Sequence, residues 1–160
     1  MLVAFEELPE SARVWIYQSD NILDSRQIEI ISEQASRFCD QWAAHSTPLK
    51  SSYKILHEKF VVLAVDEGFN EASGCSIDSS VNFIKSMEDQ LGLNFFDRTK
   101  VAFLIDDNIY TTELQSIKNE ISSGKIERNT LTFNLQAQNI AEFQDKWLMP
   151  VEESWMKRYF

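Results

Sequence analysis

A polar loop is the part of this sequence whose residue types are best suited to chemistry. It reads DEGFNEASGCSID from Asp66 to Asp78, after an apolar run and before a segment with helical spacing. The unpaired N–H groups and the positive dipole end of a helix N-terminus would stabilise a thiolate at Cys75. Cys75 is therefore a candidate nucleophile. The candidate ligand-binding residues beside it are Ser73, Gly74, Ser76 and Asp78.

A nucleophilic thiol also needs a base and a group that orients the base. The chain has two histidines, His45 and His57, and Asp66 follows directly after the apolar run. A Cys-His-Asp arrangement of these residues is one interpretation of the loop. In the other interpretation the loop only begins a helix, because Ser76 suits an N-cap and Gly74 suits a tight turn.

Two other kinds of site match the sequence poorly. Gly68 and Gly74 resemble the glycines of a phosphate-binding loop, but five residues separate them instead of four, and Cys75 stands where the lysine belongs. Nucleotide hydrolysis is therefore not expected. The two cysteines and two histidines lack the short spacings of zinc sites, so we expect no metal and no cofactor.

Composition and charge restrict the class of protein and its partners. A chain of 160 residues fits a single domain, and 25 acidic against 15 basic residues give a net charge of −10. That charge argues against nucleic acid and anionic membrane surfaces and favours a small molecule or a protein as partner, a basic protein in particular. No apolar run approaches the ~18 residues of a membrane span, and the N-terminal region is acidic, so the sequence predicts a cytoplasmic protein.

Periodicity along the chain predicts an α+β fold. The expected elements are a strand at 13–18, a helix capped by Asp24 and Gln27 that reaches Trp42, strands at 52–57 and 60–65, a helix at 77–91 closed by Gly92, and a strand at 100–105. This is the βαββαβ order of a ferredoxin-like unit, which we predict as a core over residues 13–105. An all-antiparallel sheet with flanking helices is the alternative fold.

A C-terminal extension over residues 111–160 is predicted to add a helix, a strand and a helix. Thr112 and Gln115 have the spacing of a capping box before a helix that stops at Gly124, residues 131–135 alternate as in a strand, and Pro150 ends a last helix. The final residues include Trp155, Tyr159 and Phe160, which must dock on the domain or on a second copy. A homodimer is therefore one expectation.

Several segments together resemble a known family: RVWIYQ, FCDQWAAH, FVVLAVDE, SGCSID, FFDRTKVAF and EFQDKW. The family consists of small bacterial proteins of about 160 residues with no established activity, which often carry the label "ABC transporter ATPase". The resemblance covers nearly the whole chain, and SGCSID (Ser73 to Asp78) is its most specific part. The label does not fit this sequence, because neither a Walker A loop nor an ABC signature is present.

Two functions follow from these observations. The first is a non-enzymatic module that binds a small ligand or a protein partner through the loop at 66–78. The second is a cysteine-dependent enzyme, a thiol hydrolase or acyl transferase, with Cys75 as nucleophile and His45 or His57 as base.

Overall fold

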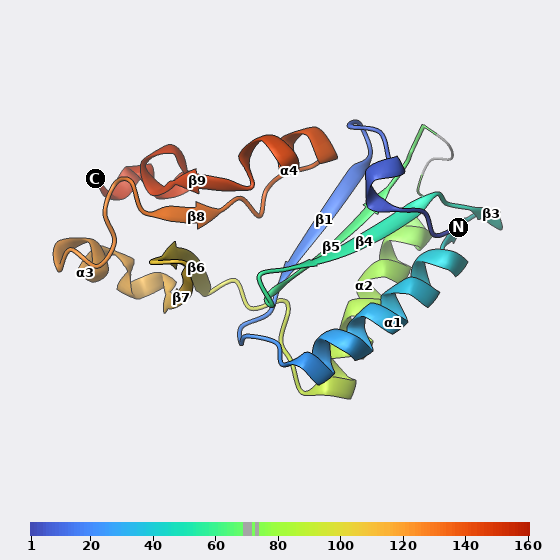
Figure 1. Cartoon of the computed structure of the whole chain (residues 1–160), viewed down its shortest axis with the longest axis horizontal. Helices are drawn as coiled ribbons and strands as arrows, with labels where there is room; N and C mark the ends of the chain where they lie inside the picture. Colours follow the sequence, from blue (N-terminus) through green and yellow to red (C-terminus); the bar gives the residue numbers. More distant parts are fainter. Residues whose placement is uncertain (69–71, 73) are drawn as a thin grey trace.

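A three-stranded antiparallel sheet forms the centre of the N-terminal half. The computed structural model describes residues 1–68, 72 and 74–160, and in it β1 (Arg13–Gln18), β5 (Phe60–Val65) and β4 (Ser51–Leu56) pair in the order β1-β5-β4 (Figure 1). The central strand β5 consists of apolar residues only, and all six are buried. A strand without polar side chains requires cover on both faces of its sheet.

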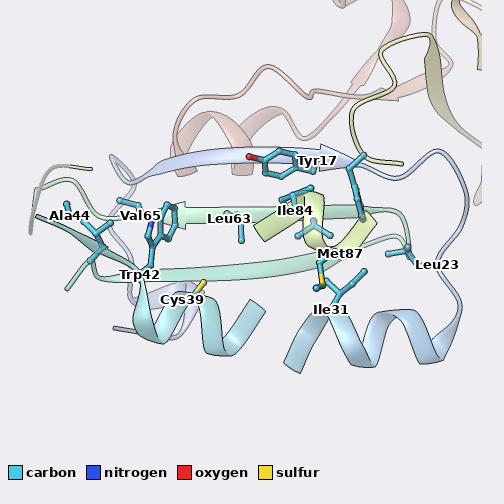
Figure 2. Packing of buried hydrophobic residues seen from close by; sticks show 13 residues of the cluster. Tyr17, Leu23, Ile31, Cys39, Trp42, Ala44, Leu63, Val65, Ile84 and Met87 are labelled. Atoms are coloured by element: carbon cyan, nitrogen blue, oxygen red, sulfur yellow. The ribbon is translucent and has the colours of Figure 1, made fainter. Parts of the chain in front are cut away.

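Two long helices cover the first face. Helix α1 (Ser25–Gln41) begins at the predicted capping box, in which Asp24 and Gln27 bond each other's main-chain N–H groups. Helix α2 (Gly74–Leu91) is followed by Gly92, whose φ of 66° favours glycine. Figure 2 shows side chains of both helices packed against those of the sheet. The helices contribute Ile31, Cys39, Ile84 and Met87, and the strands contribute Tyr17, Leu63 and Val65.

The second face is covered by chain segments from both ends of the sequence. A short 3-10 helix, η1 (Phe5–Glu7), and helix α4 (Ile140–Lys146) lie over alternate residues of β1 and β5. Phe5 and Phe143 meet there edge to face, with ring centroids 6.1 Å apart. The C-terminal segment thus completes the core of the N-terminal sheet.

A second sheet lies beside the first and has the order β7-β6-β8-β9, with antiparallel neighbours (Figure 1). Its strands are β6 (Lys100–Ile105), β7 (Asn108–Glu113), β8 (Leu131–Phe133) and β9 (Leu148–Pro150). Helix α3 (Ile117–Ser122) follows the 3-10 helix η2 (Leu114–Ser116), and the chain ends in η3 (Val151–Glu153) and η4 (Trp155–Tyr159). A small hairpin of β2 (Ala43–Ala44) and β3 (Thr47–Pro48) follows α1.

The structure confirms a mixed α+β architecture with antiparallel sheets, but it does not confirm the complete βαββαβ topology. The strand expected to lie next to β1 is β6, which belongs to the second sheet. Strand β7 pairs with β6 along its whole length on one edge, and β8 pairs with Phe103 and Leu104 on the other. In the structure, β6 thus groups with the C-terminal strands β8 and β9 in one sheet.

The region after β6 also differs from the prediction. Thr112 belongs to strand β7 and does not cap a helix; its hydroxyl lies 3.2 Å from the carboxylate of Glu120. Strand β7 is joined to β6 through Asp106 and Asp107, which both have positive φ. Two such residues form the tight turn that matches the twist of a hairpin.

Candidate functional site

The segment at 66–78 that was predicted as a loop follows β5, and its last five residues, 74–78, already belong to helix α2. One carboxylate oxygen of Asp66 accepts a hydrogen bond of 2.9 Å from the N–H of Gly68. Gly74 is the first residue of α2, and Asp78 is exposed on that helix. Ser73, the fourth of these candidates, lies outside the described residues.

Cys75 and Ser76 have different surroundings at the start of α2. The Cys75 side chain is exposed. Ser76 is buried: its hydroxyl donates to the carbonyl of Ala43 at 2.6 Å, and its own carbonyl accepts from the indole N–H of Trp42 at 2.9 Å. Ser76 therefore fastens α2 to the chain after α1, and this structural use leaves its side chain little access to a ligand.

The two histidines lie at opposite ends of the first sheet. His45, with a φ of 50°, forms the β2–β3 turn, two residues beyond the carbonyl that Ser76 binds. His57 precedes β5, whereas Asp66 follows it, and six residues of strand span roughly 20 Å. The fold therefore brings His45, and not His57, to the end of the sheet where Cys75 lies. Within the described part of the chain, no hydrogen bond joins the Cys75 thiol to either ring.

His57 instead belongs to an aromatic cluster between the two sheets. Its ring lies 5.0 Å from that of Phe133, and its Nε2 accepts a hydrogen bond of 3.3 Å from the indole of Trp147. Partial burial against these rings lowers the pKa of His57, which stays exposed on its outer side, below its ordinary value of 6.5, because the charged form loses hydration. A neutral ring is also required to accept the bond from Trp147.

A cleft between the two sheets is the site that the sequence interpretation missed. It has a volume of about 890 Å³, within the range of roughly 300–1,000 Å³ typical of ligand pockets. Its walls come from β1, from the segment that joins α2 to β6, and from the chain around β8 and η4. The lining includes residues 16–18, 95–98, 100–102, 132–136 and 153–155.

The edge of β1 forms one wall of this cleft. The N–H of Val14 points away from β5 and donates to the carbonyl of Gln138 at 3.1 Å. Because main-chain groups of an antiparallel strand alternate in direction with a period of two, Ile16 and Gln18 present their N–H and C=O groups to the same outer side. No described residue bonds the main chain of Ile16 on that side. The edge is thus closed at Val14 and again just after β1, where the N–H of Asp20 donates to the carbonyl of Asn94 at 3.0 Å, and it is open at Ile16 between them.

Large apolar side chains line the opposite walls and remain partly exposed. Phe96, Leu135 and Trp155 are 41%, 39% and 41% exposed, respectively. The ring of Phe96 meets that of Tyr17 edge to face, with centroids 5.8 Å apart. Apolar groups that line one cleft and remain in contact with water mark a binding surface, because covering them lowers the free energy.

The charges around the cleft are only partly neutralised. Lys100 forms an ion pair with Glu113, whereas Asp97, Arg98 and Glu153 take part in no ion pair with the described residues. Two hydrogen bonds from Thr99 lower the pKa of Asp97, so this carboxylate stays ionised at neutral pH. Two carboxylates and one guanidinium that have no ion-pair partner among the described residues therefore line the cleft.

A buried polar cluster of Lys59, Ser19 and Asp20 lies where the chain leaves β1 after Gln18. Lys59 is only 1% exposed, and its ammonium donates to the main-chain carbonyl of Asp20 at 3.1 Å. Burial lowers the pKa of Lys59 to about 8. Two buried oxygens next to it, Ser19 Oγ and Asp20 Oδ1, have no hydrogen-bond partner among the described residues.

The sequence carried a weak signal for this site. Phe95 and Phe96 stand side by side before the charged residues Asp97 and Arg98, in a segment that the periodicity left between a helix and a strand. Binding residues are found disproportionately on the connections between helices and strands. Their position against β1 could not be read from the sequence, because it depends on which sheet β6 joins.

Comparisons with protein-family models, with curated proteins and with solved structures found no match to this chain. In the described part of the chain, no helix has both the length and the apolar character that crossing a bilayer requires. The described His, Cys, Asp and Glu side chains form no group of three or more that could hold a metal ion.

Proposed function

We propose that this protein is a non-enzymatic binding module that holds its ligand in the cleft between the two sheets. The observation that carries this proposal is the gathering of partly exposed Phe96, Leu135 and Trp155 in a cleft of about 890 Å³. The cleft replaces the loop at 66–78 as the site we favour, because Ser76 in that loop is already used to fasten α2. The chemistry of the cleft suits association better than bond cleavage, since the hydroxyls of Thr132 and Ser154 in its lining donate to main-chain carbonyls and not to a base.

The uncharged fluorescent dye Nile red tests this proposal. We expect saturable binding with enhanced, blue-shifted emission, because the dye is bright only in apolar surroundings. The variant Leu135→Ser removes part of the apolar wall and should weaken dye binding several-fold. The matched control is Ile22→Ser, since Ile22 is 50% exposed before α1 and lines none of the cleft. Equal dye binding by the two variants would refute the cleft as the binding site.

A cysteine-dependent enzyme is the second candidate function, and the exposure of Cys75 together with the nearby turn at His45 favours it. In this candidate Cys75 attacks the substrate and His45 serves as the base. It requires the thiol to react in the folded protein, and the alkylation experiment in the Discussion measures this reactivity.

Three further proposals concern the architecture and setting of the chain. The segment from β1 to α2 has the strand order of a split βαβ unit, and we propose that it is a ferredoxin-like unit without its fourth strand. Membership in the family labelled "ABC transporter ATPase" is proposed from the sequence resemblance, without the activity in the label. A cytoplasmic location and a homodimer are proposals that also rest on the sequence.

A further inference from the structure

We propose that the ligand of the cleft is an extended, positively charged peptide segment that adds to the sheet as a new strand beside β1. This inference rests on the proposed function and specifies the class of partner. In a complete ferredoxin-like unit the fourth strand would lie next to β1, and here the cleft lies at that place. The occupant would belong to another polypeptide, because β6, which was expected there, is paired on both sides.

The open edge of β1 determines the shape of the occupant. Ile16 presents an N–H and a C=O to the cleft, and Gln18 points its main-chain groups to the same side. An extended backbone about 4.8 Å away satisfies such alternating donors and acceptors, as in peptide binding by strand addition. The segment at residues 137–140 already uses the other end of this edge, where Val14 and Ala12 bond Gln138 and Ile140. The addition of a strand would therefore continue a pairing that the protein itself begins.

The side-chain walls determine the pattern of the occupant. Alternate side chains of an added strand point to opposite sides of the sheet. One row can then cover Phe96, Leu135 and Trp155, while the other row remains near the charged rim. A sequence that alternates apolar and charged residues meets both requirements.

Charge determines the sign of the occupant. The chain carries a net charge of −10. Asp97, Glu153 and Arg98 line the cleft without an ion-pair partner among the described residues, whereas Lys100, which also lines it, is paired with Glu113. A basic peptide is attracted by this overall field, and the carboxylates of Asp97 and Glu153 at the rim are available to its cations. A second copy of the chain would bring ten further negative charges, so the charge balance opposes a homodimer at this cleft.

The probe is the synthetic peptide acetyl-(Lys-Val)₄-amide, titrated into the full-length ¹⁵N-labelled protein at low salt. We expect saturable shifts of the Ile16 and Gln18 amide signals, with a dissociation constant of roughly 10 µM to 1 mM. A peptide of the same pattern with Glu in place of Lys should bind at least tenfold more weakly. An analogue N-methylated at its four central residues, which cannot pair as a strand, should lose binding.

Two proline variants locate the strand edge. Ile16→Pro removes a main-chain N–H that faces the cleft without removing a bond to β5, and it should abolish peptide binding. The control is Thr111→Pro on β7. Ile105 and Asn108 flank the two-residue turn of the β6–β7 hairpin and are hydrogen-bonded to each other. Main-chain N–H groups along β7 then point alternately toward and away from β6, and that of Thr111 points away. This control should bind the peptide as the unaltered protein does.

The outcomes separate this inference from the proposed function. Nile red binding without peptide binding up to about 2 mM, or peptide shifts that spare Ile16 and Gln18, would overturn the inference and leave the cleft as a site for small apolar ligands. Equal binding of the N-methylated analogue would also overturn it, and this readout does not depend on whether Ile16→Pro folds. Loss of both dye and peptide binding would refute the proposed function as well.

Discussion

The side chain of Gln18 in the first sheet donates a hydrogen bond of 3.2 Å to the main-chain carbonyl of Lys100 in the second sheet. The bond joins the last residue of β1 to the first residue of β6 at one end of the cleft. Gln18 is nearly buried, so water replaces this bond poorly when it is lost.

We expect Gln18→Ala to lower the free energy of unfolding by about 1 kcal/mol, the typical net value of one intramolecular hydrogen bond. Urea denaturation followed by circular dichroism measures the change. Gln144→Ala is the matched control, because Gln144 is exposed on α4, and it should change stability by less than about 0.5 kcal/mol. Equal stability of both variants would show that the bond contributes nothing between the sheets.

Lys59 should make the stability depend on pH above neutrality. Burial lowers the pKa of Lys59 from 10.5 to about 8, so between these values the unfolded chain holds a proton that the folded chain has released. The free energy of unfolding therefore rises as the pH rises from about 8 to 10.5. Below pH 8, Lys59 is charged in both states, and the folded protein bears the full cost of burying that charge.

The variant Lys59→Met removes this dependence. Between pH 7.5 and 10.5, the free energy of unfolding of the unaltered protein should rise by about 2–3 kcal/mol relative to that of the variant. Each unit of pKa difference between the folded and unfolded states corresponds to ~1.4 kcal/mol. Lys85→Met, at an exposed position of α2, provides the control. Parallel stability curves for the protein and Lys59→Met would contradict the shift.

His57 should titrate below pH 6.5 in the folded protein, because burial lowers its pKa. The unfolded chain then takes up the proton first as the pH falls, so stability decreases on acidification through pH 6.5. Proton NMR of the imidazole follows the midpoint directly. Trp147→Phe, which removes the indole N–H donor to Nε2, should raise the midpoint, whereas Trp155→Phe should not. A midpoint above 6.5 would refute the arrangement of the aromatic cluster.

The two cysteines should differ strongly in their reaction with iodoacetamide. Cys75 is exposed, whereas burial raises the pKa of Cys39 to about 12. At pH 8 we expect mass spectrometry to find Cys75 alkylated at least a hundredfold faster than Cys39, which serves as the internal control. Equal rates would contradict the burial of Cys39.

The same measurement bears on the second candidate function. A Cys75 rate that stays equally high at pH 6, and that falls in His45→Ala, would favour the cysteine-dependent enzyme. A rate that falls steeply at pH 6 and is the same in His45→Ala would remove the support for a Cys75–His45 pair.

Local signals predicted most of the N-terminal half. Asp24 and Gln27 form the predicted capping box, and Gly92 has the positive φ expected beyond a helix end. These features depend on residues a few positions apart, so the sequence carries them completely. Strand β7 was missed because Thr112 and Gln115 have the spacing of a cap. The local pattern could not show that Thr112 instead pairs with Val101 across a hairpin.

The candidate site could be predicted only in part for the same reason. The sequence drew attention to Cys75 and to two histidines, but it contained nothing to show that the length of β5 separates His57 from Asp66. The cleft combines residues from β1 with residues more than a hundred positions later, such as Leu135 and Trp155. No local spacing predicts a meeting of that kind.

The pattern of residues along the chain is enough to predict the α+β class and the apolar strand that must be buried on both faces. Which strand lies beside β1 depends instead on contacts between distant segments. An apolar strand such as β6 gains similar burial in either sheet, so its pattern does not specify its neighbours. The tight turn at Asp106 and Asp107 supplies β7 on one side, and β8 occupies the other. With both edges of β6 filled, the edge of β1 at Ile16 stays open, and the cleft forms there.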